Sequence, residues 1–438
     1  MRLVRFLTVI LAILFCTGAL MSCAGFRKEI AGTTTDNDSR TEQTRSAESD
    51  TEAPESGTGE TEPETKPGET EKKPIESDTE ETESKGADME ARNGTIEITQ
   101  LWGADELYAR HRIPGILVTS RGTVIVYNEA RTEGSDWSLM DIFMQRSTDG
   151  GETFGEKIYL AEGTVRHKTV NNAVMTEGKD GTLHFVFCRN YSIAGEGVFY
   201  KYSRDDGLTW SPDREITEAT LPDIRNAFAP GPGHGLCLPD GTIMMPVWMV
   251  LKSAGMSVDS HGPAVLGILY SKDNGETWQT EGPITEFNGM TSASESEPVL
   301  LSDGRVMLTI RNGLPGFRGY AYSDDGIHFS KPTLDENVKD PCNFGAVASM
   351  ETPDGKHVLL LVNSDWNEND DRIHMTLRAS FDDGKTWSVK REFDADNGGY
   401  PDITVGADGT IFILYEHAYG EKMFLVRTDL SWLMEGNR

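Results

Sequence analysis

A short turn motif recurs six times in the chain and constrains the fold more than any other feature of the sequence. Each copy places a glycine between two apolar runs, at Gly122, Gly181, Gly241, Gly304, Gly355 and Gly409. Neighbouring copies are separated by 51 residues (304 to 355) up to 63 residues (241 to 304). A glycine turn, most often Asp-Gly, between two β-rich runs indicates a hairpin, because the turn requires positive φ. A hairpin repeated at this period is typical of a β-propeller.

A second motif alternates with the first and predicts a second hairpin in each period. Its clearest copies are STDGGETF (147–154), SRDDGLTW (203–210), SKDNGETW (271–278) and SFDDGKTW (380–387), with a degraded copy YSDDGIHF (322–329) and a poor sixth, RTDLSWL (427–433). The Ser, Asp, Thr and Gly of such a turn satisfy one another and the local backbone. We therefore assign these aspartates to the scaffold and not to catalysis.

Together the two motifs predict an all-β fold, a six-bladed β-propeller over residues 93–438. Each blade should contain four antiparallel strands, and an early strand at 95–98 should pair with the last blade and close the ring. Both turns of a blade then lie on one face of the propeller. The start of the first strand, the end of the second and the start of the third lie on the other face, near the central axis. We expect the functional site there.

The N-terminal segment differs in composition from the rest. Residues 1–22 combine two arginines with an apolar core that is short for a membrane span, which predicts a secretory signal peptide. The sequence LMSC at 20–23 resembles the lipobox of bacterial lipoproteins, in which the signal is cut before the Cys and the thiol carries lipid. We therefore expect Cys23 to anchor the protein to a membrane at the bacterial cell surface, outside the cytoplasm. The alternative is an ordinary signal peptide cut near Ala24, which would give a secreted protein.

Residues 23–92 predict a disordered linker between this anchor and the propeller. The segment is rich in Thr, Glu, Ser and Pro, and it has no aromatic residue after position 26. Such a chain cannot bury enough apolar surface to offset the entropy of ordering it. The net charge of the whole chain is −30, which argues against nucleic acid as a partner. After Cys23, the three remaining cysteines are too few and too scattered to indicate a disulfide framework or a zinc site. We expect a monomer without metal or cofactor.

Strand ends on the face opposite the boxes carry side chains that are unusual at such positions. Blades 1, 4, 5 and 6 contribute Arg112, Glu129, Arg131, Asp136, Trp137, Glu295, Arg311, Arg372, Tyr400 and Glu416. One surface charge at a strand end is common, but this set converges on one expected face. His234, in a Gly-Pro-Gly-His-Gly loop, is either a loop histidine with its hydrogen bonds satisfied or a ligand-binding residue.

Nearly the whole propeller region resembles the exo-α-sialidases (neuraminidases). The RIP motif at 112–114 is similar to the family's first-arginine motif. The run 135–151 is similar to the stretch with the acid/base aspartate, and 295–311 to the segment from the catalytic glutamate to the second arginine. The third arginine falls on Arg372 and the nucleophilic tyrosine on Tyr400.

The resemblance implies how a substrate would be held. Arg112, Arg311 and Arg372 would bind the carboxylate of a terminal α-linked sialic acid on a glycoprotein, glycolipid or oligosaccharide. Guanidinium groups make paired, charge-assisted hydrogen bonds to a carboxylate in a geometry that lysine cannot supply. Arg131 would support Arg112 or touch the sugar itself.

The resemblance also implies a retaining glycoside hydrolase. Glu295 would take the proton of Tyr400, Tyr400 would form a covalent glycosyl intermediate, and Asp136 would serve as general acid and then base. A neutral phenol suits attack on a carbon that already carries a carboxylate, and sialidases are the tyrosine exception to the two-carboxylate scheme.

Two alternatives stay open at the level of the sequence. One is a non-catalytic propeller that binds sialylated glycans, although Asp136, Glu295 and Tyr400 together argue against it. The other is a glycosidase or trans-glycosidase of the same fold that acts on a different acidic sugar. Departures from the family pattern at 138–140, Glu297 and Pro401 leave the identity of the acidic sugar open.

The anchor prediction is tested by metabolic labelling with a fatty acid in a bacterial host. The wild-type chain should take up label, and Cys23→Ser should abolish it because the acylated thiol is gone. Cys188→Ser is the control and should keep the label. Labelling that survives in Cys23→Ser would contradict the lipobox interpretation.

Overall fold

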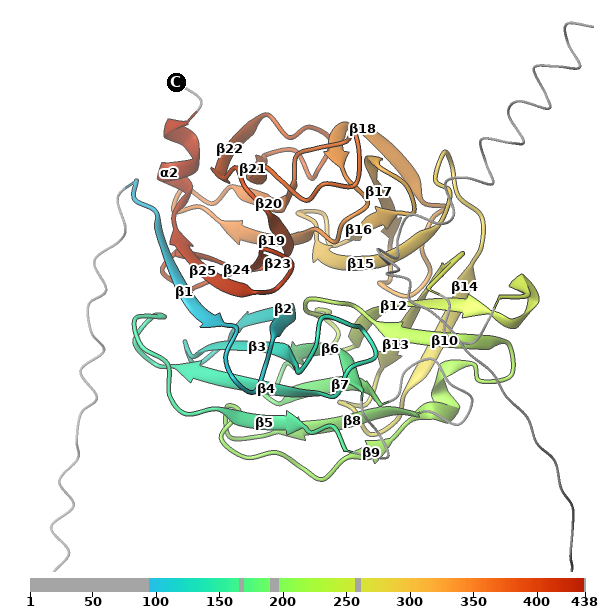
Figure 1. The fold of residues 1–438 in the computed structure, drawn as a ribbon. Coiled ribbons are helices and arrows are strands. Elements are labelled where there is room, and N and C mark those ends of the chain that lie inside the picture. The colour runs from blue at the N-terminus through green and yellow to red at the C-terminus, as the bar shows by residue number, and fades with distance from the viewer. Residues whose placement is uncertain (1–93, 165–168, 190–196, 257–260, 437–438) are drawn as a thin grey trace, which may run out of the picture. The chain divides into compact units, whose positions relative to one another are not determined.

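The computed structural model describes residues 94–164, 169–189, 197–256 and 261–436, which form six antiparallel sheets arranged as a ring of blades (Figure 1). The prediction of an all-β, six-bladed propeller is confirmed. The predicted signal peptide, Cys23 and the linker lie outside the described residues. Within the described ranges, no helix is both long and apolar enough to cross a membrane.

The blades follow one another along the chain. Blade 1 contains β2 (Arg110–Val118), β3 (Val124–Arg131), β4 (Met140–Ser147) and β5 (Ile158–Ala161). Blade 2 contains β6 (Val170–Glu177), β7 (Leu183–Arg189), β8 (Gly197–Ser203) and β9 (Arg214–Glu215). Blade 3 contains β10 (Arg225–Pro230), β12 (Ile243–Leu251), β13 (Val265–Ser271) and β14 (Gln279–Ile284), and a short β11 (Leu236–Cys237) also pairs with β12.

The second half repeats this order. Blade 4 contains β15 (Ala293–Leu300), β16 (Val306–Asn312), β17 (Gly316–Ser323) and β18 (Thr333–Asp340). Blade 5 contains β19 (Ala346–Glu351), β20 (His357–Ser364), β21 (Met375–Ser380) and β22 (Val389–Asp394). Blade 6 contains β23 (Gly398–Val405), β24 (Ile411–His417), β25 (Lys422–Thr428) and β1 (Glu97–Gly103). The first strands β2, β15, β19 and β23 lie nearest the centre of the ring (Figure 1).

The ring is closed by the predicted early strand. β1 pairs antiparallel with β25, from Glu97 opposite Arg427 to Gly103 opposite Lys422, so the two ends of the propeller share one sheet. The poor sixth box does not form a box turn. Its residues enter the short helix α2 (Leu430–Glu435), and the Asp429 side chain caps that helix by accepting from the Trp432 N–H at 2.7 Å. The sequence RTDLSWL lacks the glycine at which a box turn takes positive φ.

The aspartate boxes have the hydrogen bonds that the sequence predicts. Ser271 Oγ donates to Asp273 Oδ1 and accepts from Gly275 N, each at 2.8 Å. Asp273 in turn accepts from the backbone and hydroxyl of Thr277 at 2.8 and 2.6 Å. The degraded copy keeps Ser323 and Asp325, and there His328 takes the place of the threonine as a donor to the aspartate.

The residue that precedes the box glycine also joins neighbouring blades. Asp206 accepts from Thr123 in the turn of blade 1, Asn274 donates to Asp180 in the turn of blade 2, and Asp383 accepts from Ser302 in the turn of blade 4. Each of these box residues has positive φ, between 56° and 64°, a conformation that Asp and Asn tolerate better than other side chains. The turn motifs therefore fix neighbouring blades to one another as well as closing hairpins.

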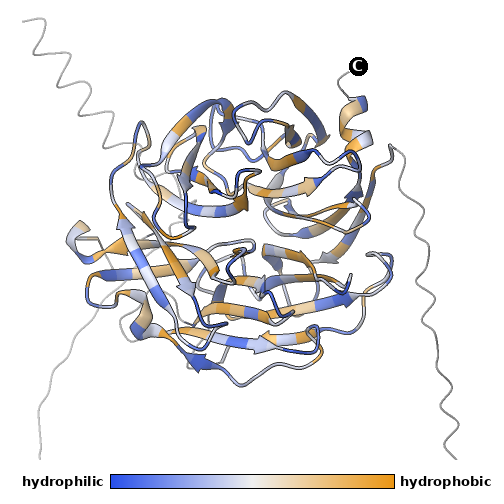
Figure 2. Ribbon diagram, turned by 180° about the vertical axis from the view of Figure 1, so that it is seen from behind, coloured by the Kyte–Doolittle hydropathy of each residue, from blue (hydrophilic) through white to orange (hydrophobic). Residues whose placement is uncertain are grey.

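The core lies between adjacent blades. Apolar and polar residues alternate along many strands, and Figure 2 shows this as alternating colour along the ribbons. Ile125 and Tyr127 of β3, for example, pack with Met175 and Phe185 of blade 2. Inner strands such as β3 are buried along their whole length, whereas outer strands such as β1 and β18 are mostly exposed or half-buried.

Ser271→Ala tests the structural assignment of the boxes. Ser271 is 1% exposed, so its loss leaves the buried N–H of Gly275 without an acceptor. We expect a loss of about 1–3 kcal/mol in the free energy of unfolding, measured by urea denaturation. Ser253→Ala, at an exposed position, is the control and should unfold as the wild type does. Equal stability of Ser271→Ala and the wild type would refute the assignment.

Candidate active site

β-Bulges shape the ends of the inner strands. Among the described strands, the first strands of blades 1, 2, 3, 4 and 6 shift register near their N-terminal ends. In β15 the shift falls between Ala293 and Ser296, and in β23 between Gly398 and Pro401. Glu295 and Tyr400 lie inside these two bulges. A bulge bends a strand and redirects its side chains, which is how residues of separate blades point at one centre.

Tyr400 and Glu295 form the centre of the site. The Tyr400 hydroxyl lies 2.7 and 2.8 Å from the two carboxylate oxygens of Glu295. Arg311 Nη1 donates to Glu295 Oε2 at 2.6 Å and also to the Tyr400 hydroxyl. Tyr400 and Glu295 are both buried. Burial raises the pKa of Tyr400 well above the usual phenol range, and the adjacent arginines offset this only in part. The phenol therefore keeps its proton until a base removes it, and Glu295 is in contact to do so.

Three arginines surround the Tyr400 ring, as the sequence predicts for an anion site. The guanidinium carbons of Arg372, Arg112 and Arg311 lie 4.9, 5.4 and 5.9 Å from the ring centroid. They come from the loop between β20 and β21, from β2 and from β16. Cations over the face of an aromatic ring are attracted by its quadrupole. The arrangement concentrates positive charge around one buried hydroxyl.

Glu416 fixes the position of Arg112. Its Oε2 forms an ion pair with Arg112 Nε at 2.8 Å, and its Oε1 accepts from the backbone N–H of Ile113 at 2.7 Å. Glu416 is fully buried. Burial alone would lower the pKa of Arg112, but the Glu416 carboxylate outweighs it and the net shift is upward. Arg112 is thus held as a cation.

Asp136 lies at the edge of this group and is partly open to solvent. It accepts from Arg131 Nη1, and Arg112 Nη1 lies 4.0 Å from the same oxygen. Arg131 is itself 3% exposed, and Glu129 accepts from its Nε at 3.0 Å. Glu129 in turn accepts from the backbone N–H of Asn172 at 2.7 Å. The structure therefore places Arg131 behind Asp136 as a supporting residue.

The charge state of Asp136 follows from these neighbours. Burial raises its pKa, but Arg131 and Arg112 outweigh that effect and bring the pKa to about 2. Asp136 is therefore a carboxylate at neutral pH when no anion is bound. Any ligand anion that neutralises Arg112 would raise this pKa and favour the protonated acid.

Two contacting residues were missed by the sequence reasoning. Phe344 packs against Tyr400 with ring centroids 5.7 Å apart, and Cys342 Sγ lies 3.4 Å from Arg311 Nη2. Both precede β19, the first strand of blade 5. We selected candidates in blades 1, 4 and 6 at the start of the first strand. The same criterion applied to blade 5 would have identified Cys342 and Phe344. Trp137 packs at the rim, 5.8 Å from His261 between ring centroids.

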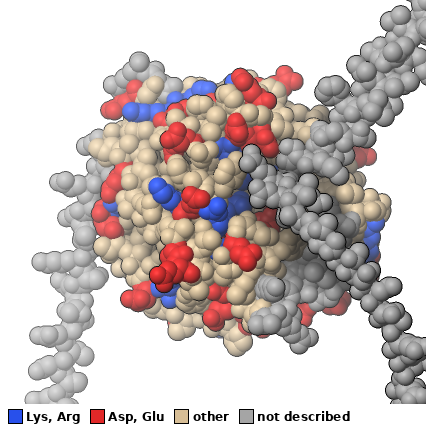
Figure 3. Space-filling view, in the orientation of Figure 1, with Lys and Arg blue, Asp and Glu red and all other residues tan. Residues whose placement is uncertain are grey.

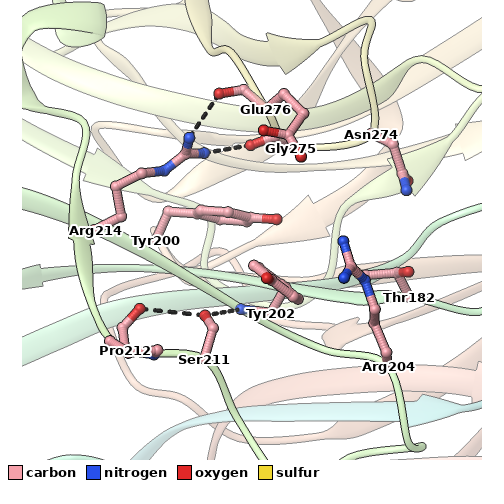
Figure 4. A pocket seen from close by; sticks show the side chains of 10 residues that line it. All are labelled: Thr182, Tyr200, Tyr202, Arg204, Ser211, Pro212, Arg214, Asn274, Gly275 and Glu276. Carbon is pink, nitrogen blue, oxygen red and sulfur yellow. Dashed lines mark hydrogen bonds between the residues drawn. The ribbon is translucent and has the colours of Figure 1, made fainter.

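Two other features of the described residues are not part of this centre. One group of His and carboxylates could hold a metal ion, and it consists of His234, Glu297 and Asp402. A cavity of about 230 Å³ lies between the outer strands of blade 2 and the box of blade 3 (Figure 4). Arg214 in that cavity donates to the carbonyls of Gly275 and Glu276. The cavity is on the side of the box turns and shares no residue with the Tyr400 site.

Comparison with known proteins supports the family resemblance. A family described as BNR repeat-like domain matches residues 127–413. A sialidase of Micromonospora viridifaciens is 31% identical over 75% of this chain and 53% of its own length. A sialidase of Bacteroides fragilis is 27% identical over 73% of this chain and 62% of its own length. This chain thus spans little more than half the length of these curated relatives.

Solved structures support the same fold. The Hadza microbial sialidase Hz136 superimposes with a TM-score of 0.65 at 24% identity, over 75% of this chain and 67% of the other. At this level of identity the likeness establishes the propeller and leaves the chemistry to be argued from the residues.

Arg131→Met tests the electrostatic account of Asp136. Removing the guanidinium takes away the strongest opposing charge, so the pKa of Asp136 should rise from about 2 by roughly one to two units. Carbon-13 NMR titration of labelled aspartate carboxyls measures it, with Asp136→Asn identifying the signal.

Arg146→Met is the matched control for that titration. Arg146 also pairs with an aspartate, Asp206 at 2.8 Å, but lies at the box end of β4. It should leave the Asp136 signal unchanged. An unchanged Asp136 pKa in Arg131→Met would contradict the account.

Proposed function

We propose, from the premise that this chain belongs to the BNR repeat-like domain family and has sialidases among its relatives, that it is a retaining exo-α-sialidase. Its reaction would be hydrolysis of terminal α-linked sialic acid from glycoconjugates. One observation carries the proposal: the Tyr400 hydroxyl contacts both oxygens of Glu295 while three guanidinium groups surround the same ring. A nucleophile in contact with its base, at an anion site, is the arrangement that the reaction needs.

The arginines supply recognition of the substrate. A sialic acid carries a carboxylate on its anomeric carbon, and Arg112, Arg311 and Arg372 can donate several N–H groups to it. On the face seen in Figure 3, acidic and basic side chains are interspersed. With a net charge of −30, the protein as a whole does not attract an anion. Affinity for the substrate therefore depends on the local arginine cluster.

Tyr400 and Glu295 supply the covalent step. As the bond from the anomeric carbon to the leaving oxygen breaks, Tyr400 Oη attacks that carbon and its proton passes to Glu295. Arg311 contacts both groups and stabilises the charge that develops on the phenolic oxygen. A carboxylate nucleophile would be repelled by the substrate carboxylate, whereas a neutral phenol is not.

Asp136 supplies the proton for the leaving group and later activates water. In the free protein Arg131 and Arg112 hold it as a carboxylate. Binding of the substrate carboxylate to Arg112 offsets one of these charges, so Asp136 becomes a better proton acceptor in the complex. In the complex Asp136 takes up a proton from solvent and donates it to the departing glycosidic oxygen. It then takes a proton from the water that hydrolyses the intermediate, while Glu295 returns its proton to the Tyr400 oxygen. Two displacements at one carbon give retention.

The proposal extends to the context of the enzyme. Sialylated glycans are the expected partners, and the lipid on Cys23 would hold a monomeric enzyme outside the cytoplasm at the bacterial surface. Two alternative activities would use the same site. One is transfer of the sugar to an acceptor other than water, and the other is hydrolysis of a different acidic sugar. The products of the reaction distinguish these outcomes.

The function is tested with two substrates, sialyllactose and an aryl α-sialoside with a good leaving group. Tyr400→Phe should lower kcat by about 10³-fold or more on both, because it removes the nucleophile. Asp136→Ala should lower kcat by about 10²–10⁴-fold on sialyllactose and much less on the aryl sialoside, whose leaving group needs no proton. Proton NMR should show the α-anomer as the first product.

Tyr202→Phe, in the outer cavity of blade 2, is the matched control and should behave as the wild type does. Wild-type protein that binds sialosides without turnover would favour the glycan-binding alternative and contradict the proposal. A first product that is a transferred sugar would establish transfer in place of hydrolysis.

A further inference from the structure

A second charged cluster lies beside the Tyr400–Glu295 pair, and the mechanism above uses none of its members. It consists of His234 from the loop between β10 and β11, Glu297 from β15 and Asp402 from β23. His234 Nδ1 lies 2.8 Å from Asp402 Oδ1 and 3.2 Å from Glu297 Oε1. Both carboxylates are fully buried, and the His234 side chain is 14% exposed. His234 is thus a loop histidine whose ring is paired with carboxylates, which agrees with the first of its two sequence interpretations.

The two carboxylates accept hydrogen bonds from backbone N–H groups of the surrounding blades. Asp402 Oδ2 accepts from Ile116 of blade 1 at 2.7 Å. Glu297 Oε2 accepts from Val347 of blade 5 at 2.6 Å, and its Oε1 accepts from the N–H of His234 in blade 3 at 3.1 Å. Blades 4 and 6 supply the carboxylates themselves. The cluster is thus a junction between inner strands.

Tyr127 connects the remaining blade to this junction. Its hydroxyl donates to the Gly233 carbonyl at 2.7 Å and accepts from the Met175 N–H of blade 2 at 3.0 Å. Parts of all six blades therefore meet here, which is possible only at the axis of the propeller. Tyr127 is the other titratable side chain that faces the cluster, and burial raises its pKa, so it stays neutral.

The cluster is built on the same two strands as the catalytic pair. Glu297 follows Glu295 by two residues on β15, and Asp402 follows Tyr400 by two residues on β23. A side chain at Gly233 would place its Cβ 2.1 Å from Glu297 Oε1 and 3.1 Å from the Phe344 ring. Phe344 in turn packs on Tyr400. The cluster and the nucleophile are thus connected through β15, β23 and the Phe344 ring.

Two buried carboxylates at this spacing repel each other. Burial and Asp402 raise the pKa of Glu297 well above its usual range, and the positive charge of His234 counters that shift in part. Burial lowers the pKa of His234, but Glu297 and Asp402 outweigh this and raise it to about 9. The 2.8 Å separation fits an N–H that donates to a carboxylate. Each carboxylate oxygen already accepts a backbone N–H, from His234 and Val347 on Glu297 and from Ile403 and Ile116 on Asp402. The contacts fit an imidazolium ion better than a metal ion.

We infer that His234 is a positioning residue, whose imidazolium bridges Glu297 and Asp402 and holds β15 and β23 at the separation at which Glu295 contacts Tyr400. Its effect on turnover rests on the proposed function, whereas its charge and its bridging role do not. Since the pKa of His234 is raised from 6.5 to about 9, the bridge contributes its full stability below pH 6.5. That contribution is lost as the pH rises through about 9.

The charge is tested first, on the wild-type protein and independently of any activity. Nitrogen-15 NMR of histidine-labelled protein, with His234→Asn identifying the signal, should show both ring nitrogens of His234 protonated at pH 7.5. Deprotonation should follow near pH 9. A neutral His234 ring at pH 7.5 would overturn the inference, as would one equivalent of metal per chain that is lost in His234→Asn.

The positioning role is tested by kinetics. His234→Asn keeps an N–H donor near Asp402 but removes the charge, so we expect kcat on the aryl sialoside to fall by about 30- to 100-fold while KM changes less than about threefold. In the Tyr400→Phe background the same substitution should change the residual rate less than about twofold, because the group that it positions is already absent.

His184→Asn is the matched control. His184 is a fully buried histidine whose ring nitrogens contact the Tyr200 hydroxyl of blade 2 and Asn274 in the box of blade 3. It should leave kcat unchanged. Equal losses of kcat in folded His184→Asn and His234→Asn, or a full loss from His234→Asn on top of Tyr400→Phe, would overturn the positioning role. Wild-type protein without turnover would refute the proposed function and leave the NMR result standing.

Discussion

The contact between Tyr400 and Glu295 joins blade 6 to blade 4 across the propeller, and the proposed chemistry depends on it. Neither strand approaches the other through a sheet hydrogen bond, so their separation is set by everything that closes the ring. β1 completes the sheet of blade 6, and the axial cluster joins the inner strands. Asp206, Asn274 and Asp383 join the turns of three pairs of neighbouring blades. The contact between these two side chains therefore depends on the closure of the whole ring.

The charged side chains of the site are held in place by ion pairs with one another. Glu416 holds Arg112, Glu295 holds Arg311, and Arg131 holds Asp136 as a carboxylate. Within the part of the chain that the structure describes, Arg112, Arg131 and Arg311 each contact a carboxylate, and Arg372 does not. A substrate carboxylate therefore enters a network that is already balanced, and its binding shifts that balance toward a protonated Asp136.

The sequence predicts the features that are local and misses those that need the closed ring. Turn chemistry at Asp-Gly and at the boxes acts over a few residues, so the blades could be counted from the sequence. The prediction of a sixth box turn at 427–433 was wrong, because RTDLSWL has no glycine for the turn. The link from Ile113 to Glu416 spans 303 residues, and the His234 cluster draws on three blades, so spacing along the chain shows neither. The resemblance to the sialidases allowed the candidate catalytic residues to be named from the sequence. The chemical roles of these residues remain a prediction.

The covalent role of Tyr400 is the central claim, and trapping the glycosyl intermediate tests it most directly. A difluorinated sialic acid with a fluoride leaving group slows both displacements and lets the intermediate accumulate. Mass spectrometry of the digested protein should then find one added monofluorinated sialosyl group, on the peptide that contains Tyr400. Label on Glu295, on Asp136 or on no residue of a protein that still turns over sialosides would contradict the account.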